Sequence, residues 1–552
     1  MAGALFAPRA RTIRMCSFDG RSREHPSHLV VILSLGMVRS TGAKMRLFGI
    51  ETEYGITRED QDTVDPVVES MELVRAHLIA SFERRWDYGG EDPHEDARGF
   101  RVSGLQQDKE EDEFAKVDAH RPFSFHEMKS DLVLPNGARF YNDHTHPEYS
   151  TPECRTLLDI LAHDRAGERI AQRAAERRNH ALGGSHVQLY KNNTDFHGHS
   201  YGCHDNYLVS RSIPFLSLTA GLLPFLVSRQ VVAGAGKVGV EGQESGFVPG
   251  QYQLSQRADF METDLSVDTM HNRPILNTRD EPHAVREKYR RLHLIIGDAN
   301  MCEYSTALKV GTTQLVLELI ARDAAPALEL EHAVTAVKQL SRDQNLKATV
   351  RQKNGSTITG LDIQEQYYLA AQKHLAGVDQ ETDWILHEWA ATLRLLTGDR
   401  RQLVGRLDWV TKLWLLETFM QEERIGWDDP WLASLDLEYH NVNPDRGLFL
   451  GLEAEGKAWR MTSEHDVESA LVVGPADTRA GIRGLCIRRF PDQITSMQWE
   501  RIQFSGGLLP RTLEMGDLFE PQAVQACAQI FESAASPIDA LNAWNREKEL
   551  SS

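Results

Sequence analysis

The alternation of apolar and polar residues along the chain predicts strands interleaved with long helices. Residues 46–56 (RLFGIETEYGI) follow the period of two that is typical of a strand with one buried face. Strand character returns at 131–150, 187–192 and 292–300, and helical spacing of apolar residues predicts helices at 65–85, 156–182, 213–232, 306–323 and over most of 361–425. Because no regular βαβ repeat appears, the pattern predicts an α+β fold with a mainly antiparallel sheet.

Two changes in composition divide the chain into regions. Residues 86–131 are polar, acidic and poor in aliphatic side chains, which predicts a long loop of the kind that is often functional. Around 473–482 the sequence turns to glycine, proline and polar residues. We therefore expect a catalytic domain over 45–475 and a small C-terminal domain over 476–552. Residues 1–44 precede Met45 and resemble an added or mis-assigned leader without a predicted role.

The overall composition narrows the class of protein. With 552 residues, 41% hydrophobic and 26% charged, the chain is typical of a globular protein. Its net charge of −19 argues against non-specific nucleic-acid binding, which requires basic surface. The six cysteines include no C-x-x-C pair, which predicts a reducing, cytoplasmic location without a structural zinc site. The apolar run at 29–38 is shorter than the roughly 18–20 residues of a membrane span, so we expect no membrane association.

Acidic side chains gather on two of the predicted strands. Alternation places Glu51 and Glu53 on one face of the first strand, and Arg139, Tyr141 and Asp143 on one face of the second. Carboxylates crowded in this way repel one another unless a cation lies among them. Mg²⁺ prefers oxygen ligands that it shares with phosphates, and a guanidinium matches phosphate oxygens. The strands therefore predict a magnesium–nucleotide site on a sheet.

Other residues near these strands extend this hypothesis. Glu148 and Glu153 offer further oxygen ligands. Asp143 is the candidate catalytic residue, either as a nucleophile or as a base that activates water, and the sequence does not choose between these roles. The alternative interpretation is a solvated sheet face with ordinary charges.

Two further motifs contain residues that could carry chemistry. The segment GAGKVGV at 234–240 lacks the spacing of a phosphate-binding P-loop and predicts a glycine turn between a helix and a strand. His144 and His146 form an H-x-H pair which, together with His204, would suit a zinc hydrolase. The dense carboxylates favour a hard cation instead, so magnesium remains the preferred metal.

Eight motifs, in order, resemble those of the Pup ligase/deamidase family, which is related to glutamine synthetase and to glutamate–cysteine ligases. They are GIETEYG, NGARFYNDHTHPEYSTPE, LYKNNTD, SYGCHDNYLVSR, PFLVSRQ, LSQRADF, NTRDEPHA and YRRLHLIIGDAN. The resemblance runs from about Met45 to the C-terminal domain. It implies a glutamine-synthetase-like large domain with a curved, mainly antiparallel sheet backed by helices, in an actinobacterial enzyme linked to the proteasome pathway.

The family has two branches, and two features resemble the deamidase branch. Residues 85–100 (RWDYGGEDPHEDARGF) resemble an extra loop that the ligase branch lacks, and DHTHPEYS is one residue shorter than the ligase form. The resemblance implies an ATP- and Mg²⁺-dependent hydrolase that deamidates the C-terminal glutamine of Pup and cleaves Pup from pupylated proteins. ATP, or ADP plus phosphate, would be a bound cofactor that is not consumed. A Pup–protein ligase is the alternative.

The motifs also imply roles for single residues. The magnesium ligands would be Glu51, Tyr141 and Glu148, completed by Glu53 and His204; the nucleotide contacts would be Arg139, Thr151 and Trp499; Asp143 would be catalytic, and His283 and His293 would face the site. Asp205 departs from the family pattern, which has glutamate after that histidine. Because Pup is acidic, a basic groove is expected, with Arg211, Arg229, Arg257, Arg279, Arg290 and Arg291 as candidates or as structural ion-pair partners.

Overall fold

The computed structural model describes residues 46–61, 64–77, 86–106, 116–184, 186–242, 246–269, 271–506 and 509–551. Three predictions fall wholly or partly outside these ranges. They are the leader at 1–44, the end of the helix predicted at 65–85 and the middle of the loop predicted at 86–131.

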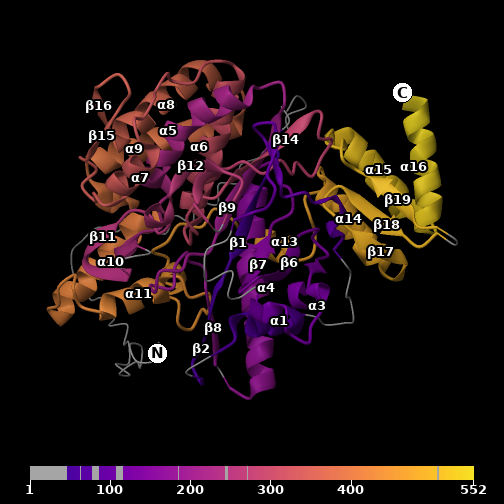
Figure 1. Ribbon diagram of the computed structural model, residues 1–552, viewed down its shortest axis with the longest axis horizontal. Helices are drawn as coiled ribbons and strands as arrows, with labels where there is room; N and C mark the ends of the chain where they lie inside the picture. The colour runs from indigo at the N-terminus through magenta and orange to yellow at the C-terminus, as the bar shows by residue number, and fades with distance from the viewer. Residues whose placement is uncertain are drawn as a thin grey trace.

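An eight-stranded sheet runs through the centre of the molecule (Figure 1), in the order β12-β13-β14-β9-β1-β7-β6-β5. Its strands are β1 (Phe48–Glu53), β5 (Leu132–Val133), β6 (Arg139–Asp143), β7 (His146–Ser150), β9 (Cys203–Ser210), β12 (Thr263–Ser266), β13 (Pro274–Asn277) and β14 (Tyr289–Leu294). Only the β12–β13 pair within this sheet is parallel. The predicted α+β class with a mainly antiparallel sheet is therefore confirmed.

The two faces of β1 have opposite characters. Phe48 and Ile50 are buried in the largest hydrophobic core, whereas Glu51 and Glu53 point to the other, half-buried face. The neighbouring strand β9, which the hydrophobic pattern did not predict, alternates in the same way. The sheet therefore has one apolar face, which packs on helices, and one polar face.

Two groups of helices cover the apolar face. Helix α4 (Leu157–Leu182) begins at the capping residue Thr156, ends at Gly183 with φ of 80°, and contributes to two separate core clusters. It packs with α1 (Pro66–Ala76). The second group is seen on the left of Figure 1 and comprises α5 (Phe215–Ala233), α6 (Glu303–Ala321), α7 (Ala333–Ser341), α8 (Gly360–Leu375), α9 (Gln380–Thr397), α10 (Asp408–Glu423) and α11 (Trp431–Tyr439). The shorter α12 (Leu448–Ala454) and α13 (Glu464–Ala470) follow.

Helix α5 is long and apolar enough by composition to cross a membrane, but two thirds of its apolar window (67%) is buried inside the protein. It packs against α6, α7 and α8, as expected of a central core helix. The segment after α5 is a glycine turn that leads into β10 (Lys237–Gly242), paired with β11 (Gly246–Gln253). Lys237 is buried there and donates to Asp259 at 2.8 Å, so the predicted turn is confirmed and this lysine serves a structural ion pair.

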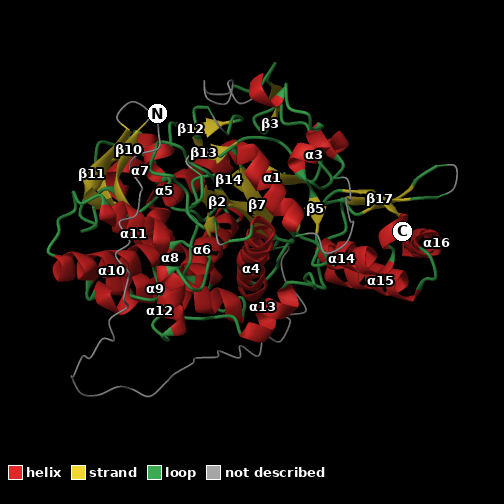
Figure 2. Cartoon of the chain, turned by 90° about the horizontal axis from the view of Figure 1, so that it is seen from below, coloured by secondary structure: helices red, strands yellow, loops and turns green. Residues whose placement is uncertain are grey.

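The C-terminal residues form a separate layer at one end of the molecule (Figures 1 and 2). This layer consists of α14 (Arg479–Arg489), the three-stranded sheet β17 (Ile494–Met497), β18 (Arg501–Phe504) and β19 (Arg511–Glu514), and the helices α15 (Pro521–Ser533) and α16 (Pro537–Ser551). Its apolar side chains form their own cluster, which Trp86 and Val133 join from the large domain. The exact domain boundary stays a prediction.

The region predicted as one long loop contains short elements in its described parts. These are a 3₁₀ turn at Tyr88–Gly90, the strand pair β3 (Glu95–Asp96) and β4 (Phe100–Arg101), and α3 (Phe125–Lys129). Outside the main sheet, β2 (Gly55–Arg58) pairs with β8 (Val187–Tyr190), and β15 (Thr349–Arg351) pairs with β16 (Thr357–Thr359). Trp86 forms a bridge to Met497, so the start of the long segment joins the C-terminal layer to the sheet.

Candidate active site

Strand register assembles the acidic residues on the polar face of the sheet. In the antiparallel ladders, Glu53 lies opposite Glu148, and Glu148 lies opposite Tyr141. Glu51 lies opposite His204 on its other side. Because directly opposite residues share a face, five predicted metal-binding side chains come together from four strands.

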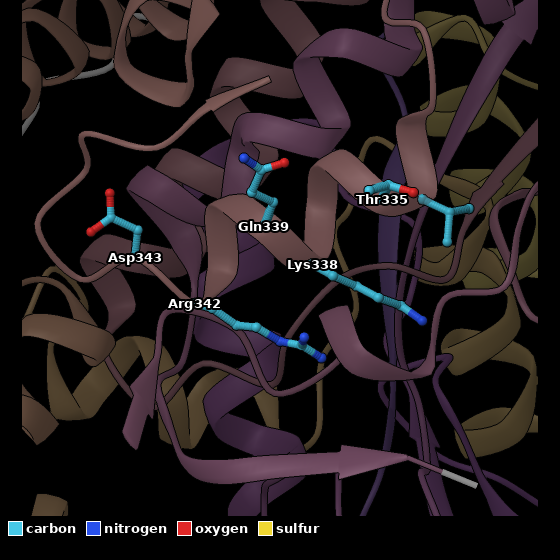
Figure 3. A pocket seen from close by; sticks show the side chains of 6 residues that line it. Thr335, Lys338, Gln339, Arg342 and Asp343 are labelled. Carbon is cyan, nitrogen blue, oxygen red and sulfur yellow. The ribbon is translucent and has the colours of Figure 1, made fainter. Parts of the chain in front are cut away.

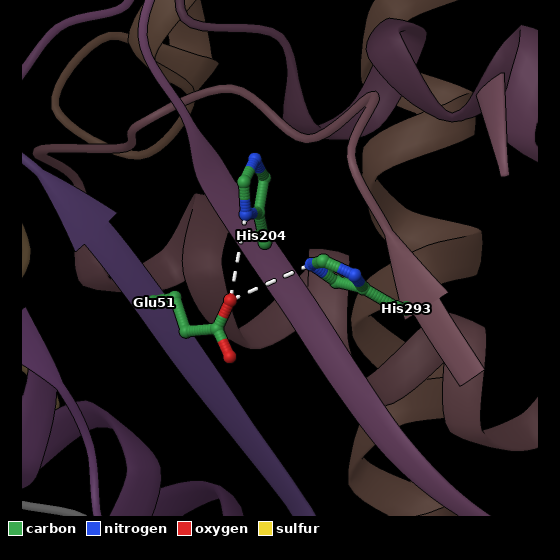
Figure 4. A group of neighbouring side chains, drawn as sticks. All are labelled: Glu51, His204 and His293. Atoms are coloured by element: carbon green, nitrogen blue, oxygen red, sulfur yellow. Dashed lines mark ion pairs between the residues drawn. The ribbon is translucent and has the colours of Figure 1, made fainter. Parts of the chain in front are cut away.

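Glu51 forms the first of two groups that suit a metal ion, together with His204 and His293 (Figure 4). They come from β1, β9 and β14 and point toward one another, with a Glu51 carboxylate oxygen 3.4 Å from Nδ1 of His204 and 3.4 Å from Nε2 of His293. Burial alone would raise the pKa of Glu51, but the two imidazoles outweigh it and hold that pKa well below its usual value. The lowered pKa favours the ionised form of the Glu51 carboxylate.

Glu53, Asp143 and Glu148 form the second group, in which one oxygen from each carboxylate lies within 4.8 Å of the others. Glu148 is 2% exposed and accepts a hydrogen bond from the Tyr141 hydroxyl at 2.7 Å. Burial, followed by repulsion from Asp143, Glu51 and Glu53, raises its pKa well above the ordinary value. Burial and Asp143 likewise raise the pKa of Glu53.

The donor sets of both groups fit divalent cations. Three carboxylates present only oxygen ligands, as a hard cation such as Mg²⁺ requires. In the first group, both ring nitrogens of the buried His293 lack a well-formed hydrogen bond within the described structure, which is costly unless another ligand satisfies them. A cation among these side chains would offset the repulsion that raises the pKa of Glu148.

Asp143 lies at the edge of the acidic group and has a partner that the sequence did not suggest. Lys129, the last residue of α3, donates to one oxygen of Asp143 at 2.7 Å. Burial alone would raise the pKa of Asp143, but the Lys129 ammonium outweighs it and lowers that pKa. The side chain of Asp143 is 41% exposed, the most open of the three carboxylates, which suits a group that reacts with a substrate.

Arg139 is held between aromatic rings beside the same face. Its guanidinium carbon is 3.7 Å from the ring centre of Tyr141 and 4.3 Å from that of Trp86. Asp131 accepts from Nε of Arg139 at 2.9 Å, and the Tyr88 hydroxyl accepts from its terminal nitrogen at 2.8 Å. The described start of the long segment, through Trp86 and Tyr88, therefore fixes this arginine.

The other predicted nucleotide contacts occupy different positions. Trp499 packs edge-on against Trp86 with ring centres 5.2 Å apart, on the side of Trp86 that belongs to the C-terminal layer. Thr151 is buried just beyond β7, and its hydroxyl accepts from the backbone nitrogen of Ile50 at 3.0 Å. Trp86 therefore links Trp499 to Arg139, whereas Thr151 is tied to the neighbouring strand.

Glu153 does not join either metal group, so its suggested role as a ligand is wrong. It accepts from Arg483 at 2.9 Å and from Arg479 at 3.1 Å, both in α14. Burial would raise its pKa, but the two arginines lower it to about 2. Arg483 also donates to the Trp499 carbonyl at 2.8 Å, so Glu153 joins the C-terminal layer to the sheet.

The predicted histidines separate into those that reach the acidic groups and those that do not. His144, at a positive φ of 57°, lies 3.5 Å from Asp118. His146 does reach the second group: its Nδ1 lies 3.5 Å from a Glu53 carboxylate oxygen, and its ring centre lies 4.4 Å from that of Tyr201. Among the described residues, neither histidine belongs to one of the two metal groups, so the H-x-H pair does not share a metal group with His204 there. His283 lies beside Glu500 at 3.9 Å and is not in either group.

Several predicted cationic residues have structural partners. Arg229 is buried and donates to Asp205 at 2.6 Å on the apolar side of the sheet. Asp205 thus faces away from His204, and its difference from the family pattern does not touch the metal groups. Arg257 is also buried and donates to the Ile295 carbonyl. Arg291 does reach the site, where it pairs with Glu51 at 3.2 Å.

A pocket of about 450 Å³ lies on α7, away from this face (Figure 3). It is lined by Val334, Thr335, Lys338, Gln339, Arg342 and Asp343. Residues of the acidic groups take no part in it, so the sheet face remains the candidate active site.

The fold and this face define a class: an enzyme built on an antiparallel sheet whose carboxylates and histidines are arranged for divalent cations. The family model described as Pup-ligase protein matches residues 46–503. The chain belongs to this family.

Curated relatives of this chain carry both activities of the family. The Pup deamidase/depupylase of Mycobacterium tuberculosis is 43% identical over 476 residues, which cover 84% of this chain and 91% of that protein. The Pup–protein ligase of Acidimicrobium ferrooxidans is also 43% identical, but over 369 residues, 65% of this chain and 80% of that protein. A solved structure of the Pup ligase PafA in complex with ADP is 36% identical with a TM-score of 0.67, covering 78% of this chain and 97% of PafA.

Proposed function

We propose that this protein is a Mg²⁺- and nucleotide-dependent hydrolase that acts on Pup. It deamidates the C-terminal glutamine of Pup to glutamate and cleaves the isopeptide bond between Pup and substrate lysines. The observation that carries this proposal is the partly exposed Asp143 at the edge of a buried carboxylate group, in a chain that matches a Pup deamidase/depupylase over 84% of the chain and 91% of that enzyme.

The two reactions are one reaction with different leaving groups. Water is added across the side-chain amide of the last residue of Pup, giving a carboxylate and releasing ammonia or the ε-amine of a lysine. Asp143 acts either as a nucleophile at the amide carbon or as the base that removes a proton from the water that attacks this carbon. Magnesium held by Glu51, Tyr141, Glu148, Glu53 and His204 would supply positive charge for the phosphates and the developing oxyanion.

Arg139, Trp499 and Thr151 are the proposed nucleotide contacts. Arg139 is buried and fixed by Asp131 and by three aromatic rings, so its guanidinium is pre-oriented for phosphate oxygens. A structure of the related PafA was solved in complex with ADP, which supports nucleotide binding by this chain. We propose ATP, or ADP plus phosphate, as a cofactor that stays bound between turnovers.

Pup–protein ligase activity is the second candidate, because a ligase relative has the same percentage identity. The ligase match is shorter, and Trp86 and Tyr88, from the segment that resembles the deamidase loop, pack around Arg139. The shorter ligase match and the presence of this deamidase-like segment beside Arg139 both favour the hydrolase. Pup and pupylated proteins are the proposed partners, in the cytoplasm and linked to the proteasome pathway, without nucleic acid or membrane.

The deciding experiment incubates the purified protein with Mg²⁺, ATP and Pup that ends in glutamine. We expect ammonia release without net ATP turnover, and release of Pup from a pupylated protein. Asp143→Asn provides the control, because it preserves side-chain size and removes the carboxylate. ATP-dependent conjugation of Pup ending in glutamate, without hydrolysis, would instead identify a ligase.

A further inference from the structure

Lys129 is placed on Asp143 by backbone contacts that do not depend on its own side chain. Arg75 in α1 donates to the Glu127 carbonyl at 2.8 Å and to the Ser130 hydroxyl at 3.0 Å. From the other side, the Asn142 side chain in β6 donates to the Met128 carbonyl at 2.8 Å. The three residues around Lys129 are thus fixed to α1 and to the strand that carries Asp143.

The local sequence also ends α3 at this point. Ser124 and Glu127 form a capping box at the start of the helix, and Ser130 adopts a left-handed conformation with φ of 48° at its end. The chain turns away directly after Lys129, so the last side chain of the helix extends over β6. Its ammonium lies 5.7 Å from the ring centre of Tyr141 and 2.7 Å from Oδ1 of Asp143.

An ordinary explanation is that the ion pair anchors a five-residue helix to the sheet. Ion pairs near the surface contribute little to stability, however, and this helix is already anchored by Arg75 and Asn142. The side chain of Lys129 is 22% exposed, so it gives up much of its hydration to contact one carboxylate. That carboxylate is the one proposed to react.

The contact engages only one of the two carboxylate oxygens. Among the described residues, Lys129 is the single side chain that hydrogen-bonds to Asp143, and it does so through Oδ1. Oδ2 has no such partner there. Glu53 and Glu148 repel the Asp143 charge, and the ammonium is the nearest group that opposes them.

We propose that Lys129 is a positioning residue for the reaction: it holds Oδ1 of Asp143, so that Oδ2 faces the amide carbon of the substrate or the water that attacks this carbon. This inference rests on the proposed function. A carboxylate hydrogen-bonded through one oxygen keeps a single rotamer, and orientation within a few tenths of an ångström is a large part of catalytic efficiency. Lys129 itself does not contact the reacting amide.

The test compares Lys129→Met and Lys129→Arg with the wild-type enzyme in ammonia release from Pup ending in glutamine, at saturating Mg²⁺ and ATP. Lys129→Met keeps the length of the side chain and removes the charge. We expect its kcat to fall about 10- to 100-fold, equivalent to about 1.4–2.7 kcal/mol, with KM for Pup and the melting temperature unchanged. Lys129→Arg should retain most of the wild-type kcat, because arginine keeps a cationic donor at this position.

Lys353→Met is the matched control. Lys353 pairs with Glu329 at 3.0 Å on the surface, where both side chains are more than 60% exposed. The Lys353→Met substitution should leave kcat and KM at wild-type values. Lys129→Gln, which keeps a donor without charge, is measured in parallel so that a folding defect in one variant does not decide the result.

The outcomes separate the two proposals. Wild-type protein that releases no ammonia would overturn the hydrolase function and, with it, the role of Lys129. Active wild-type protein together with an unchanged kcat in Lys129→Met would overturn the positioning role alone. A rise in KM without a fall in kcat would also refute it, since the lysine would then bind substrate instead of orienting Asp143.

Discussion

Replacing Glu148 by glutamine tests whether the acidic groups are built for a cation. The substitution keeps the size of the side chain and an oxygen that can accept from the Tyr141 hydroxyl, which donates at 2.7 Å in the native protein. It removes one buried negative charge. Glu148 therefore allows the electrostatic role to be separated from packing.

The structure sets the size of the effect. The acidic oxygens lie within 4.8 Å of one another, and two full charges at that distance repel by about 3.5 kcal/mol at an effective dielectric constant of about 20. Partial protonation of Glu148 and the Lys129 ammonium relieve some of this repulsion. Without a divalent cation, we expect Glu148→Gln to raise the free energy of unfolding by about 1–3 kcal/mol near pH 7.

The pH dependence has a definite sign. Burial and the neighbouring carboxylates raise the pKa of Glu148 in the folded protein above the value of the unfolded chain. The folded state then binds the proton more tightly, so the metal-free protein loses stability as the pH rises from about 4.5 through the higher, folded pKa. Glu148→Gln should flatten this slope.

The assay follows thermal and urea unfolding in EDTA and during a Mg²⁺ titration. Mg²⁺ should raise the melting temperature of the wild-type protein, because a ligand that binds only the folded state stabilises it, and should raise that of Glu148→Gln much less. Glu329→Gln, at an exposed ion pair, is the control. The electrostatic reasoning is wrong if Glu148→Gln is less stable than the wild type in EDTA. It is also wrong if Mg²⁺ raises the melting temperature of Glu148→Gln as much as that of the wild type.

Asp143→Asn should abolish amide cleavage and retain Pup binding, and a fully active variant in the ammonia assay would contradict its catalytic role. Arg483→Met should lower the free energy of unfolding in urea by about 3–5 kcal/mol, because it leaves the Glu153 charge buried without its main partner; a change below 1 kcal/mol would show that Arg479 suffices. Deleting residues 90–128, which removes most of α3 and so the support of Lys129, should alter kcat or KM for Pup, whereas unchanged kinetics would exclude a role of this segment in the reaction.

The polar face of the sheet could be predicted because it depends on local alternation. A period of two places Glu51 with Glu53 and Arg139 with Tyr141 and Asp143, and the observed strands keep those faces. The step from two strands to one site needed the register, which pairs Glu53 with Glu148 and Glu51 with His204. Family resemblance supplied that step, since alternation within one strand says nothing about its partner.

Residues whose roles depend on tertiary contacts were not predictable from pattern. Glu153 is close in sequence to Glu148 and carries the same charge, yet it lies beyond the end of β7, where α14 supplies two arginines. Arg229 was a candidate for a basic groove or for a structural ion pair, and it forms a buried pair with Asp205 behind the sheet. In each case the deciding partner lies more than 20 residues away, so neither spacing nor composition indicates it.

Lys129 is a functional candidate whose position also depends on residues distant in the sequence. Its segment is polar, lies at the end of a region that the hydrophobic pattern predicts as loop, and has no motif that would single out a lysine. Its position over Asp143 arises because Arg75 and Asn142, from two other elements, hold the backbone on either side of it. The same long segment provides Trp86 and Tyr88 at its other end, where they hold Arg139. The segment thus supplies contacts to the proposed phosphate-binding residue and to the proposed catalytic residue, which places it in a position to respond to both nucleotide and Pup.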